Sequence, residues 1–381
     1  MSVVPAGGDA ARAAMRALGL GAERGDTTFY APRYRVKVGG KELHERGSDF
    51  LSVQFKDSIK ELSSFELTLN NWDDGGEGGK PGFKYSDEDS VIALGERVEI
   101  EMGYADAPAL GPMMIGEITA FDPQFPASGA PTVAVRGLDR LHRMRNSPKS
   151  RAWKGKDSDF AKEIATAHRM QFEVDDSTLV NSLVPQDNMD DIAFLLERAK
   201  RINYELFVKD DVLHFVKTRE GQEPQLALAW GTSLVSFSPS LTIAKQVSKV
   251  TVRSWHPHEG RLIEKTAERA KISAQASGGK NAGQVLEEAF GEPKEEVITS
   301  EQVLSDEDAE RLAEAVLLRS SYAFITGQGQ TVGLPALRAG VNLRLTGLGK
   351  RFDGNYYVTE STHRIDGSGY TTSFSVRKVY A

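Results

Sequence analysis

The residue types that most often carry catalysis are few in this sequence, and their spacing is poor for it. His256 and His258 flank a proline and offer two nitrogen ligands to a metal, but no third ligand lies nearby. A turn after a strand that ends at Trp255 is the favoured interpretation of this pair. His258 is also followed by a glutamate without the second histidine that a zinc-protease helix needs. We therefore predict no metal-binding residue.

Other catalytic signatures are missing or incomplete. The chain has no cysteine, which excludes a thiol nucleophile, an iron–sulfur cluster, a zinc finger and a disulfide framework. Residues 347–350 lack the spacing of a phosphate-binding loop, and residues 367–369 lack that of a nucleophile elbow. The acidic segment 72–89 lacks the alternating ligands of a calcium loop, so it is interpreted as solvated. The sequence predicts no catalytic residue and no cofactor, and hence a protein that is not an enzyme.

Composition and charge narrow the class of protein further. At about 150 residues per domain, 381 residues predict two or three domains. The formal net charge of −7 and a pI of about 5.7 argue against specific nucleic-acid binding. No apolar run reaches the length of a membrane span, and the N-terminus lacks the apolar core of a secretion signal.

The secondary-structure elements predicted for the N-terminal part of the chain are an arm followed by β-strands. Residues 1–32, rich in alanine and glycine, are predicted to be an N-terminal arm. Six or more short strands with period-two patterning follow, which predicts a first β-barrel over residues 33–145. The clearest strand is 97–102, where Val98 and Ile100 alternate with charged residues.

The middle of the chain, residues 146–232, is predicted to be an α+β insert. Helical stripes run over residues 157–169 and 188–203, and Asn188 is the expected N-cap of the second helix. A β-hairpin is predicted over residues 204–216.

Residues 233–381 return to β patterning and predict a second β-barrel. An insertion at about residues 256–328 interrupts it, with a polar loop over 273–296 and a helix over 305–322. The predicted fold class is therefore mainly β (α+β), with two tube-like β-barrels flanking an α+β insert and a further helical and loop insertion in the second barrel.

Three ordered stretches carry a resemblance to a known family. They are LGERVEIEMGY at residues 94–104, preceded by WDD and FKY; QDNMDDIAFLLERAKRINYELF at residues 186–207 with VLHF at 212–215; and GNYYVTESTH at residues 354–363 ahead of YTTSFSV at 370–376. In this order they resemble the phage late control protein D family. That family provides the base-plate hub of contractile tails and is similar to the N-terminal hub part of VgrG spikes. The resemblance covers residues 34–379.

The residues that carry the resemblance are structural rather than catalytic: Gly95, Val98, Ile100, Gly103, Tyr104, Phe194, Leu195, Tyr356 and Val358. Gly95 and Gly103 are expected to supply turns at the two ends of a strand. Tyr104 is expected to pack its ring at the barrel rim. On the strand at residues 356–361, one face is expected to be buried and the other free.

The resemblance implies a role in assembly. Two tube-like barrels per chain, in a homotrimer, would give a ring of six similar barrels that joins a six-fold inner tube protein to a three-fold central spike. The implied partners also include base-plate wedge proteins and LysM-bearing hub proteins, without specific nucleic-acid binding or a membrane span. Because the chain ends at Ala381, directly after its last strand, the spike is predicted to be a separate polypeptide. The protein would be assembled in the cytoplasm of the producing cell and become a component of the base plate of a phage tail or injection particle.

Several questions stay open at the level of sequence. The sequence does not decide whether the particle is a phage, a tailocin, an extracellular injection system or a type VI-like device. A free-standing all-β binding module or a secreted effector is the alternative function, and a tail-associated hydrolase is a less favoured one. For a hub, strands 97–102 and 370–376 are predicted to stack on the tube, with Arg97, Glu99 and Glu101 facing the lumen or a neighbouring barrel.

Overall fold

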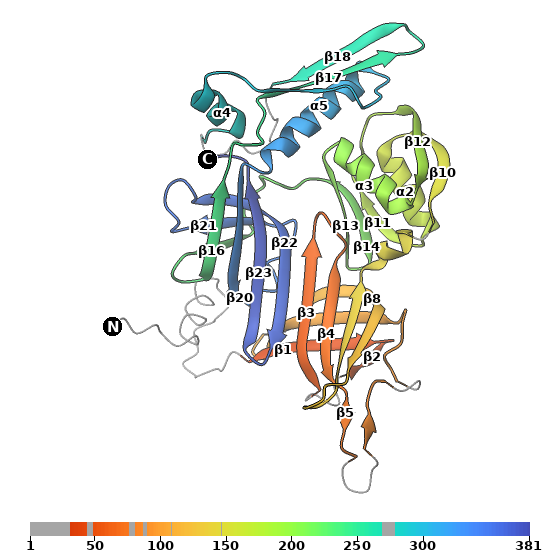
Figure 1. The fold of residues 1–381 in the computed structure, drawn as a ribbon, viewed down its shortest axis with the longest axis vertical. Helices are drawn as coiled ribbons and strands as arrows, with labels where there is room; N and C mark the ends of the chain where they lie inside the picture. Colours follow the sequence, from red (N-terminus) through yellow and green to blue (C-terminus); the bar gives the residue numbers. More distant parts are fainter. Residues whose placement is uncertain are drawn as a thin grey trace.

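The computed structural model describes residues 31–43, 49–75, 81–86, 90–107, 109–145, 147–268 and 279–381 (Figure 1). The predicted N-terminal arm, except for its last two residues, lies outside the described residues.

One 13-stranded sheet runs through both β regions. Its main path has the order β16-β20-β23-β22-β3-β4-β9-β8-β7-β1-β2. Strand β22 (Gly354–Asp366) pairs antiparallel with β3 (Phe50–Ser58), so the C-terminal β region is hydrogen-bonded directly to the N-terminal one. Figure 1 shows these strands as an unbroken row across the molecule, with β16 at one side and β8 at the other. The predicted mainly β fold class is confirmed.

The N-terminal β region follows the predicted alternation closely. Its other strands are β1 (Pro32–Val38), β2 (Lys41–Glu42), β4 (Ser64–Asn70), β5 (Trp72–Asp73), β6 (Gly82–Phe83), β7 (Arg97–Tyr104), β8 (Gly111–Gln124) and β9 (Thr132–Leu138). In β7, Val98, Ile100 and Met102 are fully buried in one hydrophobic core. Ile365 and Tyr370, from the C-terminal region, belong to the same core, because β22 lies beside β3.

The α+β insert packs as a separate small core on the side of the sheet. It contains a 3₁₀ helix η2 (Arg140–Arg145), β10 (Lys149–Gly155), α2 (Asp157–Ala167), β11 (Gln171–Val174), β12 (Asn181–Met189), α3 (Asp191–Arg201), β13 (Tyr204–Lys209) and β14 (Val212–Lys217). Both helices and the hairpin are where the sequence predicts them. The predicted N-cap Asn188 is wrong: Asp190 caps α3 by accepting a hydrogen bond from the Ala193 amide. Asn188 instead lies one residue before the end of β12, with its φ in the left-handed region.

The C-terminal β region contributes β15 (Leu226–Ala229), β16 (Leu234–Leu241), β20 (Ile325–Val332), β21 (Asn342–Thr346), β22 and β23 (Gly369–Lys378). It has its own hydrophobic core, which includes Tyr356 and Val358. Strands β15 and β21 lie off the main path, where β21 pairs with β22.

The insertion in this region forms a small layered unit. Strands β17 (Lys249–His256), β18 (Arg261–Ala267) and β19 (Glu295–Ile298) form a three-stranded sheet, which packs on helix α5 (Asp306–Ser321) around a fourth core. The predicted loop over residues 273–296 is wrong for its later part. Residues Ala282–Phe290 form helix α4, because Asn281 and Gln284 make a reciprocal capping box and Gly291 ends the helix in the left-handed region. The insertion and α5 lie at the same end of the molecule as the C-terminus (Figure 1).

In the part of the chain that the structure describes, four hydrophobic clusters therefore accompany one continuous sheet. The division into domains at residues 33–145, 146–232 and 233–381 stays a prediction, since the shared sheet crosses the boundary between the two β regions. Among the described residues, no helix is long and apolar enough to cross a membrane.

Candidate functional site: a polar sheet face between two open edges

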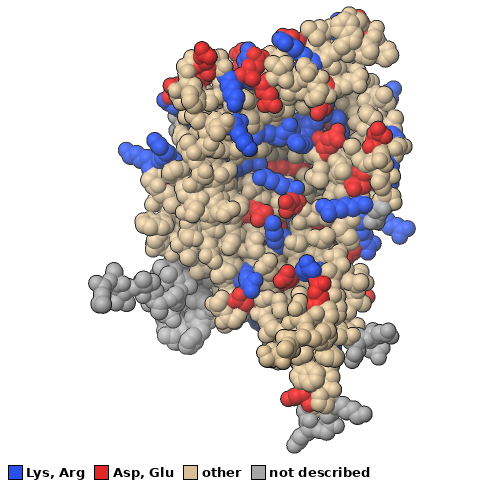
Figure 2. Space-filling view, in the orientation of Figure 1, with Lys and Arg blue, Asp and Glu red and all other residues tan. Residues whose placement is uncertain are grey.

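One face of the continuous sheet carries small polar side chains from strand to strand. Strand β20 presents Thr326, Gln328 and Gln330 on this face, and glycines occupy its buried positions. The register extends the pattern across the sheet in rows, one of which is Ser236, Gln330, Ser373, Thr362, Lys56 and Ser64. Over β16 and β20 the surface is almost free of charged side chains (Figure 2). We call the surface that these alternate residues of β16, β20, β23, β22, β3, β4 and β9 form the polar face.

The charged residues of the polar face lie on β22, β3, β4 and β9, and most of them form ion pairs. Lys56 lies 3.1 Å from Glu360, and Arg364 donates a hydrogen bond of 2.7 Å to Asp366. Arg136, opposite Glu66 in the register, pairs with Asp122. The named charged residues of the polar face are therefore three cations and three carboxylates, with Asp122 of β8 beside them, so the face is neither strongly basic nor strongly acidic.

The polar face is bounded by β16 at one end of the sheet and by the second half of β8, while the first half of β8 carries the sheet on to β7, β1 and β2. In the described part of the chain, β20 is the only strand that pairs with β16, and the first residue of β16, Leu234, also forms a single bridge with Trp230. At the other end, β8 is long enough to have two partners in sequence: Gly111–Glu117 pairs with β7, while Glu117–Gln124 pairs with β9. Ile118 still forms backbone hydrogen bonds with Gly95 and Glu96, but among the described residues no strand pairs with the outer side of residues 119–124. Unpaired strand edges are ready acceptors of a further strand.

Neither strand predicted from the sequence to stack on a tube is an edge. Strand β7 lies between β1 and β8, and β23 lies between β20 and β22. The outward charges of β7 are used within the chain, because Glu101 pairs with Arg35 at 2.7 Å and Glu99 lies 3.8 Å from Lys37. These two strands therefore cannot accept a further strand along their sides, and their stacking on a tube stays a prediction. Alternation alone distinguishes the two faces of a strand but not an edge from an interior position.

The signature residues near β7 have different structural roles. Gly95 adopts a φ of +86°, in a turn that a side chain would strain. Gly103 was predicted to lie in a turn, but it is inside β7 opposite Arg33, and a β-carbon there would lie 3.1 Å from Leu110. Tyr104 is half-buried; its hydroxyl donates a hydrogen bond of 2.8 Å to the Gly333 carbonyl, which belongs to the C-terminal region.

The other signature residues lie in two different cores. Phe194 and Leu195 are buried in the insert, where Phe194 stacks on Trp153 with ring centroids 5.6 Å apart. Tyr356 and Val358 are buried in the C-terminal core. Because they occupy separate cores, the structure does not bring the nine signature residues together at one site.

The expectation of one free face on residues 356–361 is wrong. Tyr357 and Thr359, on the side opposite Tyr356, are also buried. The Tyr357 hydroxyl donates a hydrogen bond of 2.7 Å to Glu205 of β13, since the insert packs over this end of β22. The sequence pattern could not show this, because the covering residues lie 150 positions away.

A buried charge cluster joins the insert to the C-terminal β region. Arg377 of β23 lies 2.8 Å from Glu220 and 3.8 Å from Glu205, and its guanidinium stacks 3.4 Å from the centroid of the Tyr322 ring. Burial raises the pKa of both glutamates, although Arg377 opposes this shift. The burial of Tyr322 also raises its pKa. We call Arg377, Glu205, Glu220, Tyr322 and Tyr357 the junction cluster.

A second buried cluster has the residue types of a serine hydrolase but not its connectivity. Asp57 accepts a hydrogen bond from Ser361 and pairs with Arg338 at 2.6 Å, so it does not orient His363. His363 Nε2 lies 3.0 Å from the Leu337 carbonyl, which can only accept, so this nitrogen carries a proton. It therefore cannot take the proton of Ser361, 3.2 Å away. Burial lowers the pKa of His363 to about 4.

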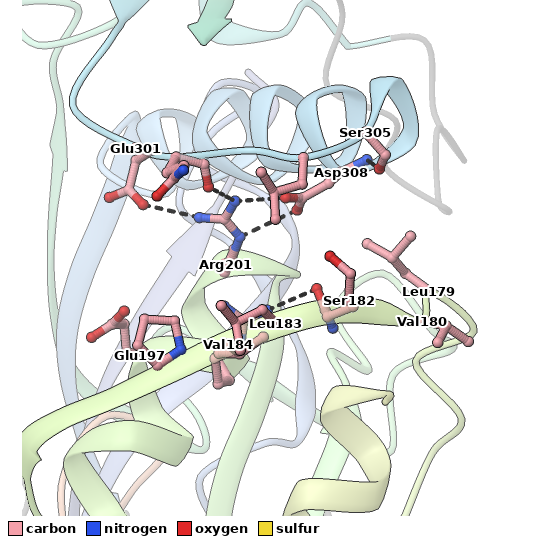
Figure 3. A pocket seen from close by; sticks show the side chains of 15 residues that line it. Leu179, Val180, Ser182, Leu183, Val184, Glu197, Arg201, Glu301, Ser305 and Asp308 are labelled. Carbon is pink, nitrogen blue, oxygen red and sulfur yellow. Dashed lines mark hydrogen bonds and ion pairs between the residues drawn. The ribbon is translucent and has the colours of Figure 1, made fainter. Parts of the chain in front are cut away.

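A pocket of about 400 Å³ lies between the insert and the N-terminal end of α5 (Figure 3). Arg201 of α3 points across it to Glu301 and Asp308, at 2.9 Å from each. A further hydrogen bond of 3.2 Å joins Arg201 to the Gln302 carbonyl. Since its guanidinium is engaged by these groups, the pocket is a contact between α5 and the insert rather than an arrangement for catalysis.

The two histidines considered for a metal lie at the end of β17. His256 Nδ1 accepts a hydrogen bond of 3.1 Å from the Glu259 amide, as in a turn after a strand. Among the described residues, no group of three or more histidine, aspartate or glutamate side chains is arranged to hold a metal ion.

The combination of one continuous sheet, a polar face and a side insert defines a class of protein by its fold. Among solved structures, the 43 kDa tail protein of prophage MuSo2 from Shewanella oneidensis has a TM-score of 0.68 at 13% identity, covering 91% of this chain and 98% of that one. The tail protein from Neisseria meningitidis MC58 has a TM-score of 0.65 at 13% identity, covering 92% and 98%. A component of the type VI secretion system of E. coli, described as structurally similar to T4 tail proteins gp27 and gp5, has a TM-score of 0.55 at 13% identity, covering 92% and 77%. The chain therefore has a tail-protein fold.

The family follows from the sequence itself. The family model of the Alg8 N-terminal domain matches residues 30–367, and the chain belongs to this family. No curated protein matches the sequence significantly.

Proposed function

We propose that this protein is a non-enzymatic structural hub of a contractile tail or injection machine, of the late control protein D type. Three copies form a ring that joins a six-fold inner tube to a three-fold central spike. The tail-protein fold and the hub-like sequence stretches support this role. The observation that carries it is the polar face, bounded by two open sheet edges.

Ring closure by the two edges is geometrically simple. From β16 to β8 the sheet has eight strands, and every neighbouring pair is antiparallel. Because the number is even, β16 and β8 run in opposite directions. The β16 edge of one copy can therefore join the β8 edge of the next and continue the antiparallel pattern. Such head-to-tail contacts close into a ring under cyclic symmetry.

The spacing of strands favours three copies. At ~4.8 Å per strand, three copies without strand tilt would give a wall about 115 Å around and about 37 Å across at the backbone. With the same spacing, a ring of two copies would be about 24 Å across at the backbone. Side chains from opposite walls would fill most of that width. Three copies of a chain with two β regions would also present six similar units to a six-fold tube.

In this ring the polar face lines the channel. Small uncharged side chains and paired charges offer little to retain cargo of either sign, which suits a passage. The inner tube protein, a separate spike protein, base-plate wedge proteins and LysM-bearing hub proteins are the proposed partners. The particle would be assembled in the cytoplasm of the producing cell and carry this protein in its base plate.

The assembly is tested by light scattering coupled to gel filtration on the full chain. We expect a mass of about three times 41.7 kDa, alone or with the spike protein. A monomer at micromolar concentration that also fails to form trimers with the spike protein would contradict the proposal.

A further inference from the structure

Three aromatic side chains form an exposed cluster at one end of the N-terminal β region. Trp72, Phe83 and Phe125, which we call the rim cluster, contact one another edge to face, with ring centroids 5.6 Å apart for Trp72 and Phe83 and 5.2 Å apart for Phe83 and Phe125. They are 37%, 37% and 58% exposed. Large exposed aromatic rings that gather in one place mark interaction sites more often than isolated ones do.

The rim cluster lies beyond the ends of the strands, not on their sides. Asn70, Thr132 and Gln124 end three neighbouring strands in register. Trp72 follows Asn70 by two residues, and Phe125 follows Gln124 directly, so both continue past the sheet along the strands. Figure 1 shows β5 projecting at the end of the molecule away from the C-terminus and the insert.

The base of the rim cluster is held by buried polar contacts. Asn71 is fully buried; its side chain accepts a hydrogen bond of 2.9 Å from the Tyr85 amide and donates one of 2.6 Å to Ser86. Asp49, also buried, accepts hydrogen bonds from Lys84 at 2.6 Å and from the Tyr85 hydroxyl at 3.0 Å. These contacts fix the segments that carry Trp72 and Phe83, so little order has to be gained on binding.

We propose that the rim cluster docks the ring of tube protein that stacks on this end of the hub. This inference rests on the proposed function. A neighbouring copy in the hub ring would lie beside the strands, at β16 and β8, whereas the rim cluster points along them toward a coaxial partner. The opposite end is occupied by the insert and by the unit around α5. Since Asp73 and Asp74 adjoin Trp72, the socket on the partner is apolar with a basic border.

The experiment measures binding of the purified tube protein of the same particle to the full-length hub. The variants are Phe125→Ser and the double variant Phe83→Ser/Phe125→Ser. Trp255→Ser is the matched control, because Trp255 is 61% exposed but lies in the insertion at the other end of the molecule. We expect the single variant to bind at least about tenfold more weakly and the double variant about 30-fold more weakly, as for hot-spot residues. Trp255→Ser should stay within about twofold of the wild type.

Three results with the Phe125→Ser variant would overturn the inference. Unchanged affinity of Phe125→Ser, in a protein with unchanged trimer mass and unfolding midpoint, would mean that the cluster does not touch the tube. Loss of the trimer would make the cluster a contact between copies. Loss of spike binding with normal tube binding would assign this end to the spike. If the wild type forms trimers but binds no tube protein, the inference about the rim cluster fails while ring formation stands. If the wild type forms no trimer, the proposed function itself fails.

Discussion

Arg377 and Glu220 form a buried ion pair that ties the last strand of the sheet to the segment that follows the insert. Arg377 Nε and Nη2 lie 3.0 and 2.8 Å from the same oxygen of Glu220, and both side chains are less than a tenth exposed. Glu205 of the insert completes the arrangement at 3.8 Å. Arg377 is therefore one of the contacts that hold the insert against the sheet, beside the hydrogen bond from Tyr357 to Glu205.

Removing this arginine should destabilise the protein strongly. Arg377→Met would leave two buried glutamates without their cation, and breaking such a cluster costs about 3–5 kcal/mol of unfolding free energy. Urea unfolding measures this loss. Adding Glu220→Gln to Arg377→Met should recover part of it, because one buried negative charge is removed. A loss below about 1 kcal/mol for Arg377→Met would show that the junction cluster is not buried as described.

His363 should make stability depend on acid. Its pKa falls from 6.5 in the unfolded chain to about 4 in the folded protein, because burial favours the neutral ring. This contribution to stability is fully present above pH 6.5 and is lost as the pH falls toward 4, by about 3 kcal/mol. The free energy of unfolding, measured by urea between pH 7.5 and 4, should fall more steeply in the wild type than in His363→Gln. Parallel pH profiles of the two proteins would contradict a buried neutral histidine.

A charge change should prevent folding on the buried face of β7 but be tolerated on its outer face. Ile100→Asp places a carboxylate in the N-terminal core and should prevent folding. Glu99→Lys removes partly exposed ion pairs with Arg97 and Lys37 and should cost less than about 1 kcal/mol. Since β7 is an interior strand, Glu99→Lys should not weaken tube binding. Circular dichroism and tube-binding measurements test these outcomes, and normal folding of Ile100→Asp would reverse the assigned faces.

Gly137 is closely packed between β8 and β4, which a substitution can test. A β-carbon on Gly137 would lie 2.2 Å from the Glu117 carbonyl oxygen and 2.3 Å from the Phe65 ring. We expect Gly137→Ala to lower the unfolding free energy by about 1–3 kcal/mol. Gly82→Ala, where nothing lies within 4 Å of the added carbon, is the control and should change stability by less than about 0.5 kcal/mol. Equal stability of the two variants would contradict the packing.

Alternation predicts the strands whose core positions are filled by apolar side chains, such as β7. It misses β20, whose sequence is ITGQGQTV, because glycines take its buried positions. Gly327 makes room for Phe237, and Gly329 makes room for Phe374, so the apolar groups that fill the core come from other strands. Because β20 was not predicted as a strand, the sequence pattern did not predict the polar face that it helps to form.

Contacts between segments far apart in the chain could not be predicted from the sequence pattern either. Pairing of β22 with β3 joins residues about 300 positions apart, and it decides which strands are edges. The burial of Tyr357 likewise depends on Glu205 of the insert. Local patterning predicts elements and faces, whereas edges and covered faces depend on long-range packing.

The most direct test of ring closure uses the absence of cysteine. Ser236→Cys on β16 and Ala120→Cys on β8 can be combined in one chain, and a short bismaleimide then added. Within a chain these positions are seven strand spacings apart, about 34 Å, too far for the reagent to bridge. We predict covalent dimers and trimers that stop at about three times 41.7 kDa, while either single variant stays monomeric on a denaturing gel. A chain that stays monomeric with both cysteines, or a ladder that continues past the trimer, would contradict a closed ring of three copies.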